Sequence, residues 1–516
     1  MSKKIVIPDL SKHLIVKGTL ILTITGIMTR FIGFYNRIFL SDLIGSKELG
    51  VYQLVLPIYI LAFAICTYGN ELALTRLVSQ YNNKQVQHVF FRCCTVISFS
   101  CSIIISFLLY CYADFISIHF LNTPDCAGCI RILCYGIPSI SLKGCIHGYF
   151  LGKQDSSVHG ISDLIEQTMK ILSLYILITL FFPHQKYNAE FAIYGIVCSE
   201  YISLLYSLYR YVRFLRTEKN NNLNHTTCTY TNRELYKIFM KNAFPMTLNR
   251  FAITLIQSVE AILIPAALLA YYHNENESLS VYGIIMGISF PFIMFPATIT
   301  NAMSSMLMPA VSCAKGENNN KTLQKIVEES VHFCLLIGIF SAIFFFIAGK
   351  EIGICFFHNE TAGVYLQQLS FLCPLIYLST TFASILNGLG DITRNLTQTL
   401  IATAIRIFFI LFLIPKWGTN GYILGLFFSY LILSYMASYR VTKQIHFQIS
   451  FVKSILLPAI FFLIAGYGYY FCCKKSMSMF HSENNIFMLF IFIALYGLTT
   501  IVPVILTTYK AQQQRH

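Results

Sequence analysis

The sequence predicts an all-α polytopic membrane protein of about 14 transmembrane helices, arranged as two parallel six-helix repeats plus two extra C-terminal helices. The 516-residue chain is 56% hydrophobic and only 12% charged, about half the charged fraction of an average soluble domain. Its mean hydropathy is +0.62. Its apolar residues form runs of roughly 20 or more, enough to cross a hydrocarbon core of about 30 Å. Because a backbone in lipid must satisfy its own hydrogen bonds, such runs favour helices over barrel strands.

The repeats are visible as an internal duplication with an offset of roughly 230 residues. Four pairs of segments show it: Thr29-Arg30-Phe31 with Asn249-Arg250-Phe251, 51–56 with 281–286, 152–155 with 388–391, and Tyr209-Arg210 with Tyr439-Arg440. Six spans per repeat is an even number, so both repeats begin on the same side of the membrane. Parallel repeats of this kind form two bundles with a cavity between them.

The expected spans follow the apolar runs in order. Those of the first repeat lie near 18–40, 50–78, 89–112, 128–151, 160–182 and 190–212. Those of the second lie near 236–270, 280–312, 326–348, 363–388, 395–415 and 420–440, and the two extra spans near 452–473 and 485–508. The expected domains are an N-terminal lobe (1–215), a cytoplasmic linker (216–232), a C-terminal lobe (233–446) and a C-terminal helix pair with its tail (447–516). This leaves no room for an extramembrane catalytic domain.

The net charge of +14 indicates membrane topology rather than nucleic-acid binding. Most Lys and Arg residues fall in connections on one side of the spans, as the positive-inside rule expects. We therefore expect a multi-pass membrane protein with both termini in the cytoplasm. The first apolar stretch is too long for a cleavable signal. Most of the 17 cysteines lie in apolar runs as small hydrophobes; for the pair Cys126 and Cys129, a disulfide is the alternative.

Ionisable side chains inside spans cost about 2.5–3.5 kcal/mol each on insertion scales, so each needs a reason. Arg30 and Arg37 lie two turns apart on nearly one face of the first span, and Arg76 lies in the second. Arg250 and the polar Asn301 lie in the seventh and eighth spans. These residues predict a substrate site for an anionic head group that carries sugars. The alternative is that the arginines snorkel to the interface or are neutralised by carboxylates.

A second set predicts ion coupling or gating, and it consists of Glu71, Glu166, Lys170, Glu260 and Arg406. Glu166 and Lys170 have the i,i+4 spacing of a helical ion pair, for which we favour a structural role. At the matched place of the second repeat lie Ala402 and Arg406, and the role of this arginine stays open. Glu260 could pair with a basic residue or bind a coupling cation or proton.

No constellation in the sequence is typical of an enzyme. There is no Walker loop, no His-rich metal set and no convincing Ser/His/Asp grouping. Lys143 and His147 are also i,i+4 in the fourth span, where a histidine more often makes helix contacts than binds a ligand. We therefore expect no catalysis and no cofactor, with transport driven by Na⁺, H⁺ or the membrane potential.

The segments 17–23, 43–45, 49–54 and 57–59, with Gly26-Ile-Met-Thr-Arg30-Phe-Ile-Gly33-Phe, resemble the stage V sporulation protein B family. That family lies in the polysaccharide-transporter branch of a superfamily that includes multidrug exporters and MurJ-type lipid II flippases. Glu260-Ala-Ile-Leu-Ile-Pro265, downstream of Arg250, is similar to the same family.

The resemblance implies a V-shaped pair of lobes, with spans one, two, seven and eight lining a cationic cavity and the two extra helices forming a groove for a polyprenyl tail. It also implies that Arg30, Arg37, Arg76 and Arg250 contact the pyrophosphate and sugars of a lipid-linked precursor.

The predicted function is translocation of an undecaprenyl-linked oligosaccharide by alternating access, as a peptidoglycan precursor for spore cortex or cell-wall synthesis. The expected partners are this substrate, membrane lipids and cell-wall synthesis enzymes. One alternative is a cation-coupled multidrug antiporter, which predicts a cavity of carboxylates and aromatics, whereas arginine outnumbers acidic residues on the first two spans. Another is a non-transporting scaffold for wall-synthesis enzymes.

Overall fold

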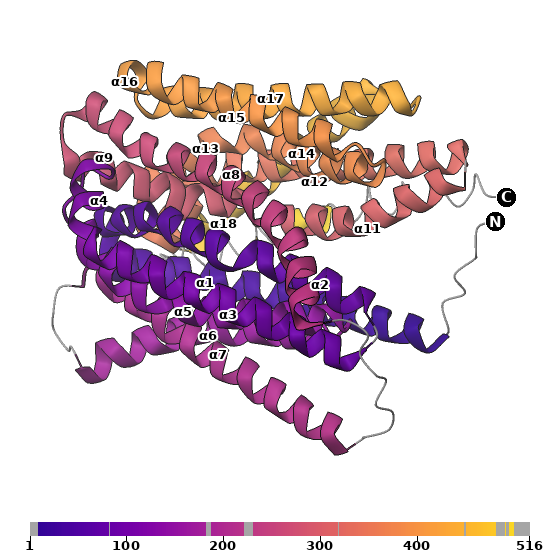
Figure 1. Cartoon of the computed structure of the whole chain (residues 1–516). Helices are drawn as coiled ribbons and strands as arrows, with labels where there is room; N and C mark the ends of the chain where they lie inside the picture. The colour runs from indigo at the N-terminus through magenta and orange to yellow at the C-terminus, as the bar shows by residue number, and fades with distance from the viewer. Residues whose placement is uncertain are drawn as a thin grey trace. The chain divides into compact units, whose positions relative to one another are not determined.

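Long helices make up almost all of the described chain, and the described residues contain no β-strand (Figure 1). The computed structural model describes residues 9–81, 83–181, 187–220, 231–317, 319–447, 450–480, 491 and 495–499. The chain divides into two compact units, Met1–Ala266 and Ala267–His516. The all-α polytopic class predicted from the sequence is confirmed. The lobe boundaries predicted at 215 and 233 stay a prediction.

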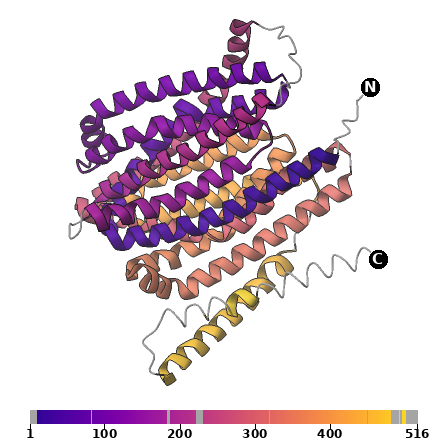
Figure 2. The ribbon, with the colours of Figure 1, turned by 90° about the horizontal axis from the view of Figure 1, so that it is seen from below.

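The first unit contains the helices of the first repeat and most of one further helix. These elements are α1 (Asp9–Phe63), the π-helical turn η1 (Ala64–Tyr68), α2 (Gly69–Gln80), α3 (Lys84–Cys111), α4 (Ala113–His119), α5 (Cys126–Gly152), α6 (Ser157–Ile176), η2 (Leu177–Phe181), α7 (Ala189–Asn220) and α8 (Asn232–Tyr272). Helix α5 packs against α2, α3 and α7, and α6 packs against α1 and α7. Figure 2 shows these indigo-to-magenta helices running largely side by side.

The second unit has a comparable series of helices. They are α9 (Glu275–Tyr282), η3 (Gly283–Ser289), α10 (Phe290–Ile293), α11 (Ala297–Gly316), α12 (Asn320–Phe357), α13 (Glu360–Leu369), η4 (Ser370–Leu372), α14 (Cys373–Gly388), α15 (Ile392–Phe412), α16 (Ile414–Trp417), α17 (Thr419–Gln444), η5 (Val452–Leu456) and α18 (Leu457–Phe480). Helix α14 packs against α11, α12 and α17, and α18 packs along α12.

The number of membrane spans can be compared with the prediction over the described residues only. Ten helices there are long and apolar enough to cross a membrane, or eleven if the bent pair 275–293 and 297–316 is one span. One of the ten is a 57-residue stretch over Ile24–Gln80. At 1.5 Å per residue it is far longer than one span needs, and Gly45 breaks it with a φ of 75°. The first two predicted spans flank this glycine. The last predicted span, near 485–508, lies mostly outside the described residues, so the total of 14 stays a prediction.

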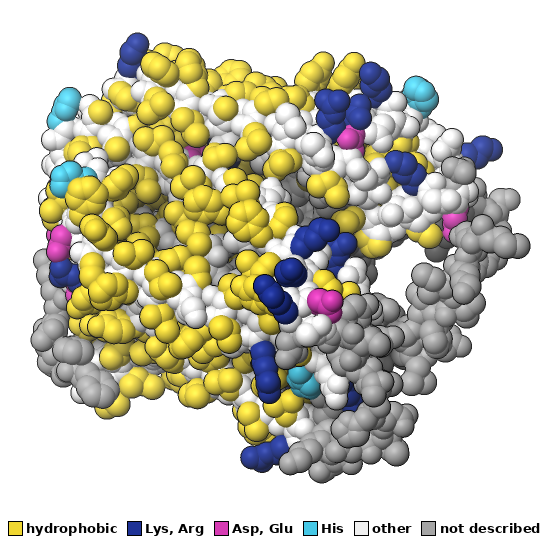
Figure 3. All heavy atoms as spheres, viewed as in Figure 1, with side chains coloured by type: hydrophobic (Ala, Val, Ile, Leu, Met, Phe, Trp, Pro, Cys, Tyr) yellow, Lys and Arg dark blue, Asp and Glu magenta, His cyan; other side chains and the backbone are white. Residues whose placement is uncertain are grey.

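Large apolar side chains are exposed on the outer faces of the helices, as contact with lipid requires. On α3, for example, Val96, Ile103 and Phe107 are 64%, 48% and 67% exposed. Figure 3 shows apolar side chains covering most of the face in view, while many of the Lys and Arg side chains lie toward the helix ends on the right. The side chains of Cys126 and Cys129 are both buried.

The internal duplication is supported by an ion pair that recurs at matched places in the two units. In the first unit Arg210 of α7 pairs with Asp155, at 3.7 Å, in the turn between α5 and α6. In the second unit Arg440 of α17 pairs with Asp391, at 2.5 Å, in the turn between α14 and α15. Both pairs join residues of the repeated sequence segments. In each repeat, an ion pair thus links the turn after the fourth predicted span to the helix of the sixth predicted span.

The Asp391 pair yields a prediction about stability. Arg440 Nε and Gln444 Nε2 both donate to Asp391 Oδ2, at 2.5 and 2.7 Å. The hydrogen bond from Arg440 holds the pKa of the Asp391 carboxyl below its ordinary value of 3.8. A carboxyl with a lowered pKa stabilises the fold above its unfolded pKa, and this stabilisation is lost as the pH falls through the folded value.

We therefore expect Asp391→Asn to lower the stability of the detergent-solubilised protein by about 0.5–1 kcal/mol at neutral pH. The difference from wild type should vanish at a pH below the lowered pKa, because the wild-type carboxyl is then protonated too. Thermal unfolding followed across pH measures this. The control is Glu329→Gln, which removes only the exposed i,i+4 pair with Lys325 at 3.8 Å. An Asp391→Asn effect no larger than that of the control would contradict the prediction.

Candidate functional site

A cluster of four charged side chains lies inside the first unit, and we call Lys143, Glu166, Lys170 and Glu200 the four-charge cluster. Lys143 Nζ of α5 donates to Glu166 Oε2 of α6 at 2.7 Å and also to Glu200 Oε2 of α7. Lys170 Nζ donates to Glu166 Oε1 at 2.7 Å. Tyr59 OH of α1 donates to Glu200 Oε1 at 3.2 Å. The cluster therefore joins the consecutive helices α5, α6 and α7, and Tyr59 links α1 to it.

Burial and charge balance define what the cluster can do. The side chains of Lys143, Glu166 and Glu200 are 5%, 14% and 3% exposed, and that of Lys170 is 17% exposed. Two ammonium groups face two carboxylates, so the net charge is zero. Buried charges are tolerated when they are paired and hydrogen-bonded, whereas removal of one partner leaves an uncompensated charge. This arrangement favours a structural role for the cluster at rest.

The sequence predicts one of these contacts and misses the others. The ion pair of Glu166 and Lys170 is present as predicted, at i,i+4 spacing. The sequence indicates no partner for Lys143 and gives no role to Glu200. The available signal for Glu200 is a carboxylate in the middle of the sixth predicted span, which must find a basic partner on another helix.

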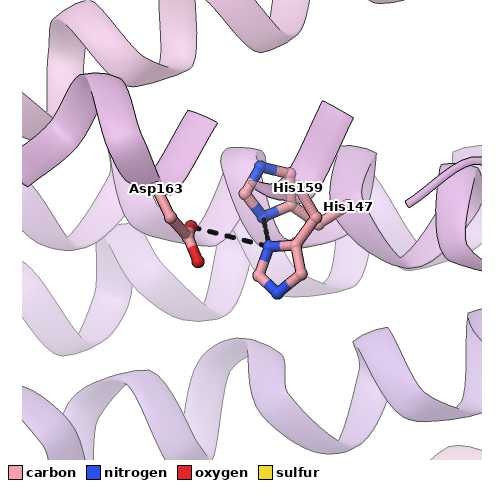
Figure 4. Close-up of side chains that lie close together, drawn as sticks. All are labelled: His147, His159 and Asp163. Atoms are coloured by element: carbon pink, nitrogen blue, oxygen red, sulfur yellow. Dashed lines mark hydrogen bonds and ion pairs between the residues drawn. The ribbon is translucent and has the colours of Figure 1, made fainter. Parts of the chain in front are cut away.

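Next to this cluster, His147, His159 and Asp163 form a compact group (Figure 4). His147 Nδ1 of α5 lies 3.0 Å from His159 Nδ1, near the start of α6. His159 Nδ1 lies 3.5 Å from Asp163 Oδ1, one turn further along α6. His147 is buried at 3% exposure, whereas the side chains of His159 and Asp163 are 33% and 40% exposed.

Glu71, a predicted coupling residue, is placed on α2 directly against α5. Two glycines of α5 permit this approach: a Cβ at Gly148 would lie 2.8 Å from the Glu71 carbonyl oxygen, and one at Gly144 would lie 3.3 Å from Glu71 Oε2. Glu71 therefore flanks the same stretch of α5 that carries Lys143 and His147. A larger residue at either glycine would push α2 away.

The predicted substrate-binding arginines lie on three helices of the first unit. Arg30 and Arg76 are exposed, on α1 and α2, and Arg37 of α1 is half-buried. The guanidinium of Arg250, on α8, stacks over the Tyr68 ring with 4.3 Å from Cζ to the ring centroid. Beside it α8 comes close to η1 and α2. This approach requires the glycine at position 69, because a Cβ there would collide with the Thr247 backbone.

The remaining predicted residues lie elsewhere. Glu260 is buried on α8, at 8% exposure. Asn301 is half-buried on α11 of the second unit. Arg406 of α15 donates from Nη2 to Thr403 Oγ1 at 3.2 Å, and its Cζ lies 5.6 Å from the centroid of the Tyr430 ring. The site roles of all these residues stay predictions.

An apolar groove of about 600 Å³ lies between α1 and α6 in the first unit. Its lining residues are Phe31, Ile32, Tyr35 and Phe39 from α1, with Thr168, Ile171, Leu172 and Tyr175 from α6. Arg30 immediately precedes this lining in the chain, and Arg37 lies within the same segment of α1. Groove and cations are thus carried by one helix segment.

Comparisons with known proteins agree with this architecture. Residues 15–312 match the family described as polysaccharide biosynthesis protein, and residues 251–412 match the MatE family. Stage V sporulation protein B of Bacillus subtilis (strain 168) is 23% identical over 469 residues, which cover 89% of each chain. Lipid II flippase MurJ of the same organism is 21% identical over 481 residues, covering 88% of this chain and 87% of MurJ.

A solved structure of lipid II flippase MurJ in an inward closed conformation shares the fold, with a TM-score of 0.70 and 13% identity. The alignment covers 94% of this chain and 97% of that one. The predicted resemblance to the stage V sporulation protein B family and to MurJ-type flippases is therefore confirmed. The polysaccharide biosynthesis match spans more than half of the sequence, so this chain is a multi-span membrane protein that belongs to the polysaccharide biosynthesis protein family.

Proposed function

We propose that this protein is a flippase that carries an undecaprenyl-linked oligosaccharide across the bacterial plasma membrane by alternating access. The proposal is supported by the family match over residues 15–312 and by the relatives, among them a lipid II flippase. The cargo we favour is a peptidoglycan precursor for spore cortex or cell-wall synthesis. Such a cargo has an apolar tail, a diphosphate and a glycan, so its carrier needs an apolar surface beside cationic groups.

The observation that carries this proposal is the combination of exposed arginine and apolar groove on α1. Arg30 exposes its side chain immediately before the segment that lines the groove between α1 and α6. Arginine binds phosphate well because its planar guanidinium donates two parallel hydrogen bonds. A lipid diphosphate at Arg30 would leave its isoprenoid chain close to apolar side chains. We propose this groove for the tail in addition to the C-terminal helix pair implied by the resemblance.

Arg250 offers a second recognition group of a different kind. Its cation–π contact with Tyr68 holds the guanidinium over the ring without using its N–H groups as hydrogen-bond donors. A pre-oriented arginine loses less conformational entropy on binding a phosphate or a sugar hydroxyl. We propose that Arg250 contacts the head group, together with Arg37, Arg76 and Asn301.

Energy coupling belongs to the same proposal. Glu71 and Glu260 are candidates for Na⁺ or H⁺ coupling, and the membrane potential is a further driving force for a cargo with net charge. We place both termini in the cytoplasm and expect membrane lipids and wall-synthesis enzymes as partners. The proposed reaction moves a molecule without changing its covalent bonds, so no enzyme activity and no cofactor are required.

A cation-coupled multidrug antiporter is the second candidate, because residues 251–412 match the MatE family. Such a protein should transport organic cations at the expense of an ion gradient. The arginines on α1, α2 and α8 disfavour a cationic cargo, since like charges would repel it. Uptake of an organic cation by vesicles that contain the protein separates the two functions.

The arginines yield a prediction about transport. In vesicles reconstituted with a lipid-linked precursor, Arg30→Ala and Arg250→Ala should each reduce flipping at least tenfold, since each removes a charge-assisted contact of about 1.5–3 kcal/mol. Arg250→Lys should retain part of the activity, because lysine keeps the charge but loses the planar stack on Tyr68. Accessibility of the precursor to an external modifying enzyme measures the rate.

The matched control is Arg131→Ala, which removes an arginine of α5 that forms an exposed pair with Asp114. This variant should flip as wild type does. Full activity in both Arg30→Ala and Arg250→Ala would refute the proposed site. Absence of flipping in the wild type, with organic-cation transport in its place, would favour the antiporter, and absence of both would favour the scaffold.

The four-charge cluster yields a prediction about its role. Glu200→Gln should destabilise the protein by about 3–5 kcal/mol. The carboxylate of Glu166 would then be the one negative charge left in the cluster to balance the two buried ammonium groups of Lys143 and Lys170. The charge-balanced double variant Lys143→Met with Glu200→Gln should recover most of this loss. Thermal unfolding in detergent measures stability, and the vesicle assay measures transport in the same preparations.

The double variant also separates structure from coupling. A structural cluster predicts that flipping returns with stability in the double variant. If stability returns but flipping does not, the cluster takes part in ion coupling or gating, as the alternative assignment of Glu166 and Lys170 requires. If Glu200→Gln unfolds as wild type does, the structural role is wrong.

A further inference from the structure

We infer that His147, His159 and Asp163 form a binding site for a divalent transition-metal ion of the zinc class, which would join α5 to α6. This inference goes beyond the proposed function and does not depend on it. The group offers two imidazole nitrogens and one carboxylate oxygen, and these three atoms all lie within 4.8 Å of one another. Imidazole and carboxylate ligands suit Zn²⁺ and its neighbours among the first-row metals.

Two of the three ligand–ligand distances are close to those around a tetrahedral ion. Bonds of about 2.0–2.1 Å at tetrahedral angles place two ligand atoms about 3.3 Å apart. The two histidine Nδ1 atoms are 3.0 Å apart, and His159 Nδ1 lies 3.5 Å from Asp163 Oδ1. In Figure 4 the two rings and the carboxylate point toward one another. Small side-chain adjustments would therefore bring all three atoms onto one ion, and the fourth position would remain open for water.

The hydrogen bonds behind His147 prepare its Nδ1 as a ligand. Ser207 Oγ donates to the Ser203 carbonyl at 3.0 Å, so it can accept from His147 Nε2, which lies 3.4 Å away. A proton on Nε2 leaves a lone pair on Nδ1, directed at His159. Metal-bound histidines commonly donate their other ring N–H to a fixed oxygen in this way. His159 needs only to carry its own proton on Nε2 to offer Nδ1 as well.

The surrounding charges also favour a cation. Asp163 brings a negative charge to the ligand set. Lys143 lies one turn before His147 on α5, but its ammonium is held by Glu166 and Glu200. Glu71 contributes a further acidic group against the same part of α5. Two of the ligands are 33% and 40% exposed, so an ion has a path to the site.

The site's position suggests what the ion would do. His147 lies near the end of α5 and His159 near the start of α6, so the ion would bridge two helices that follow each other through a short turn. By the predicted topology this turn is cytoplasmic. A metal there would fix the α5–α6 hairpin and make the stability of the first unit depend on the metal supply.

The test uses the full-length protein in detergent, stripped with a chelator and titrated with Zn²⁺ or Co²⁺. Wild type should bind one ion that His159→Gln and Asp163→Asn each bind at least tenfold more weakly. Bound Co²⁺ should show the visible absorption of tetrahedral coordination, and Zn²⁺ should raise the unfolding temperature of wild type but not of the variants. Both altered side chains are partly exposed and nearly isosteric, so we expect both variants to fold.

His332→Gln is the matched control. It alters a half-buried histidine of α12 that contacts Ser454 and lies in the other unit. This variant should bind metal as wild type does, which shows that the loss of a histidine elsewhere does not weaken binding. Equal metal affinity in wild type, His159→Gln and Asp163→Asn would overturn the inference and leave a simple hydrogen-bonded histidine pair. Because the readout is binding, the result stands whether or not flipping is observed.

Discussion

The constraint on which the first unit depends is that a charge within a membrane span must find its compensation inside the protein. The four-charge cluster meets this requirement with two lysines and two glutamates shared among α5, α6 and α7. Because neither ammonium group can leave without stranding a carboxylate, these helices are held in one register. Tyr59 adds α1 to the arrangement through Glu200. The arrangement of the unit's inner helices follows from these contacts as much as from apolar packing.

The two halves of the chain compensate their buried charges in different ways, although they share one pattern of helices. At the positions that match Glu166, Lys170 and Glu200, the second half has Ala402, Arg406 and Tyr430. Arg406 lies over the Tyr430 ring, so the same two helices face each other there. The cation is kept, while a methyl group and an aromatic ring stand at the positions of the two carboxylates. Duplication thus preserved the scaffold, including the Asp–Arg pair of each turn, and let the polar interior of each half diverge.

How much the sequence could predict depends on the range of the interaction. Long apolar helices and the i,i+4 pair of Glu166 with Lys170 follow from local periodicity, and the described residues contain both. The links from Lys143 to Glu200 and from Tyr59 to Glu200 could not be predicted, because they depend on which helices become neighbours. In the sequence His147 stands as a lone intramembrane histidine for the same reason. Its partner His159 is near in sequence, but a turn separates the two, and helical periodicity does not extend across a turn.

The same contacts decide which predicted residues remain available for transport. Glu166 and Lys170 each have a charged partner within 2.7 Å, so taking up a proton or a cation there requires breaking a buried pair first. Arg30 and Arg76 instead expose their side chains, and Arg250 rests on an aromatic ring that leaves hydrogen-bond donors available. A carrier for an anionic lipid needs accessible cations that are held in place by well-packed helices. The paired, neutral charges in the interior therefore hold the first unit together, and the accessible arginines are the groups that can bind the proposed cargo.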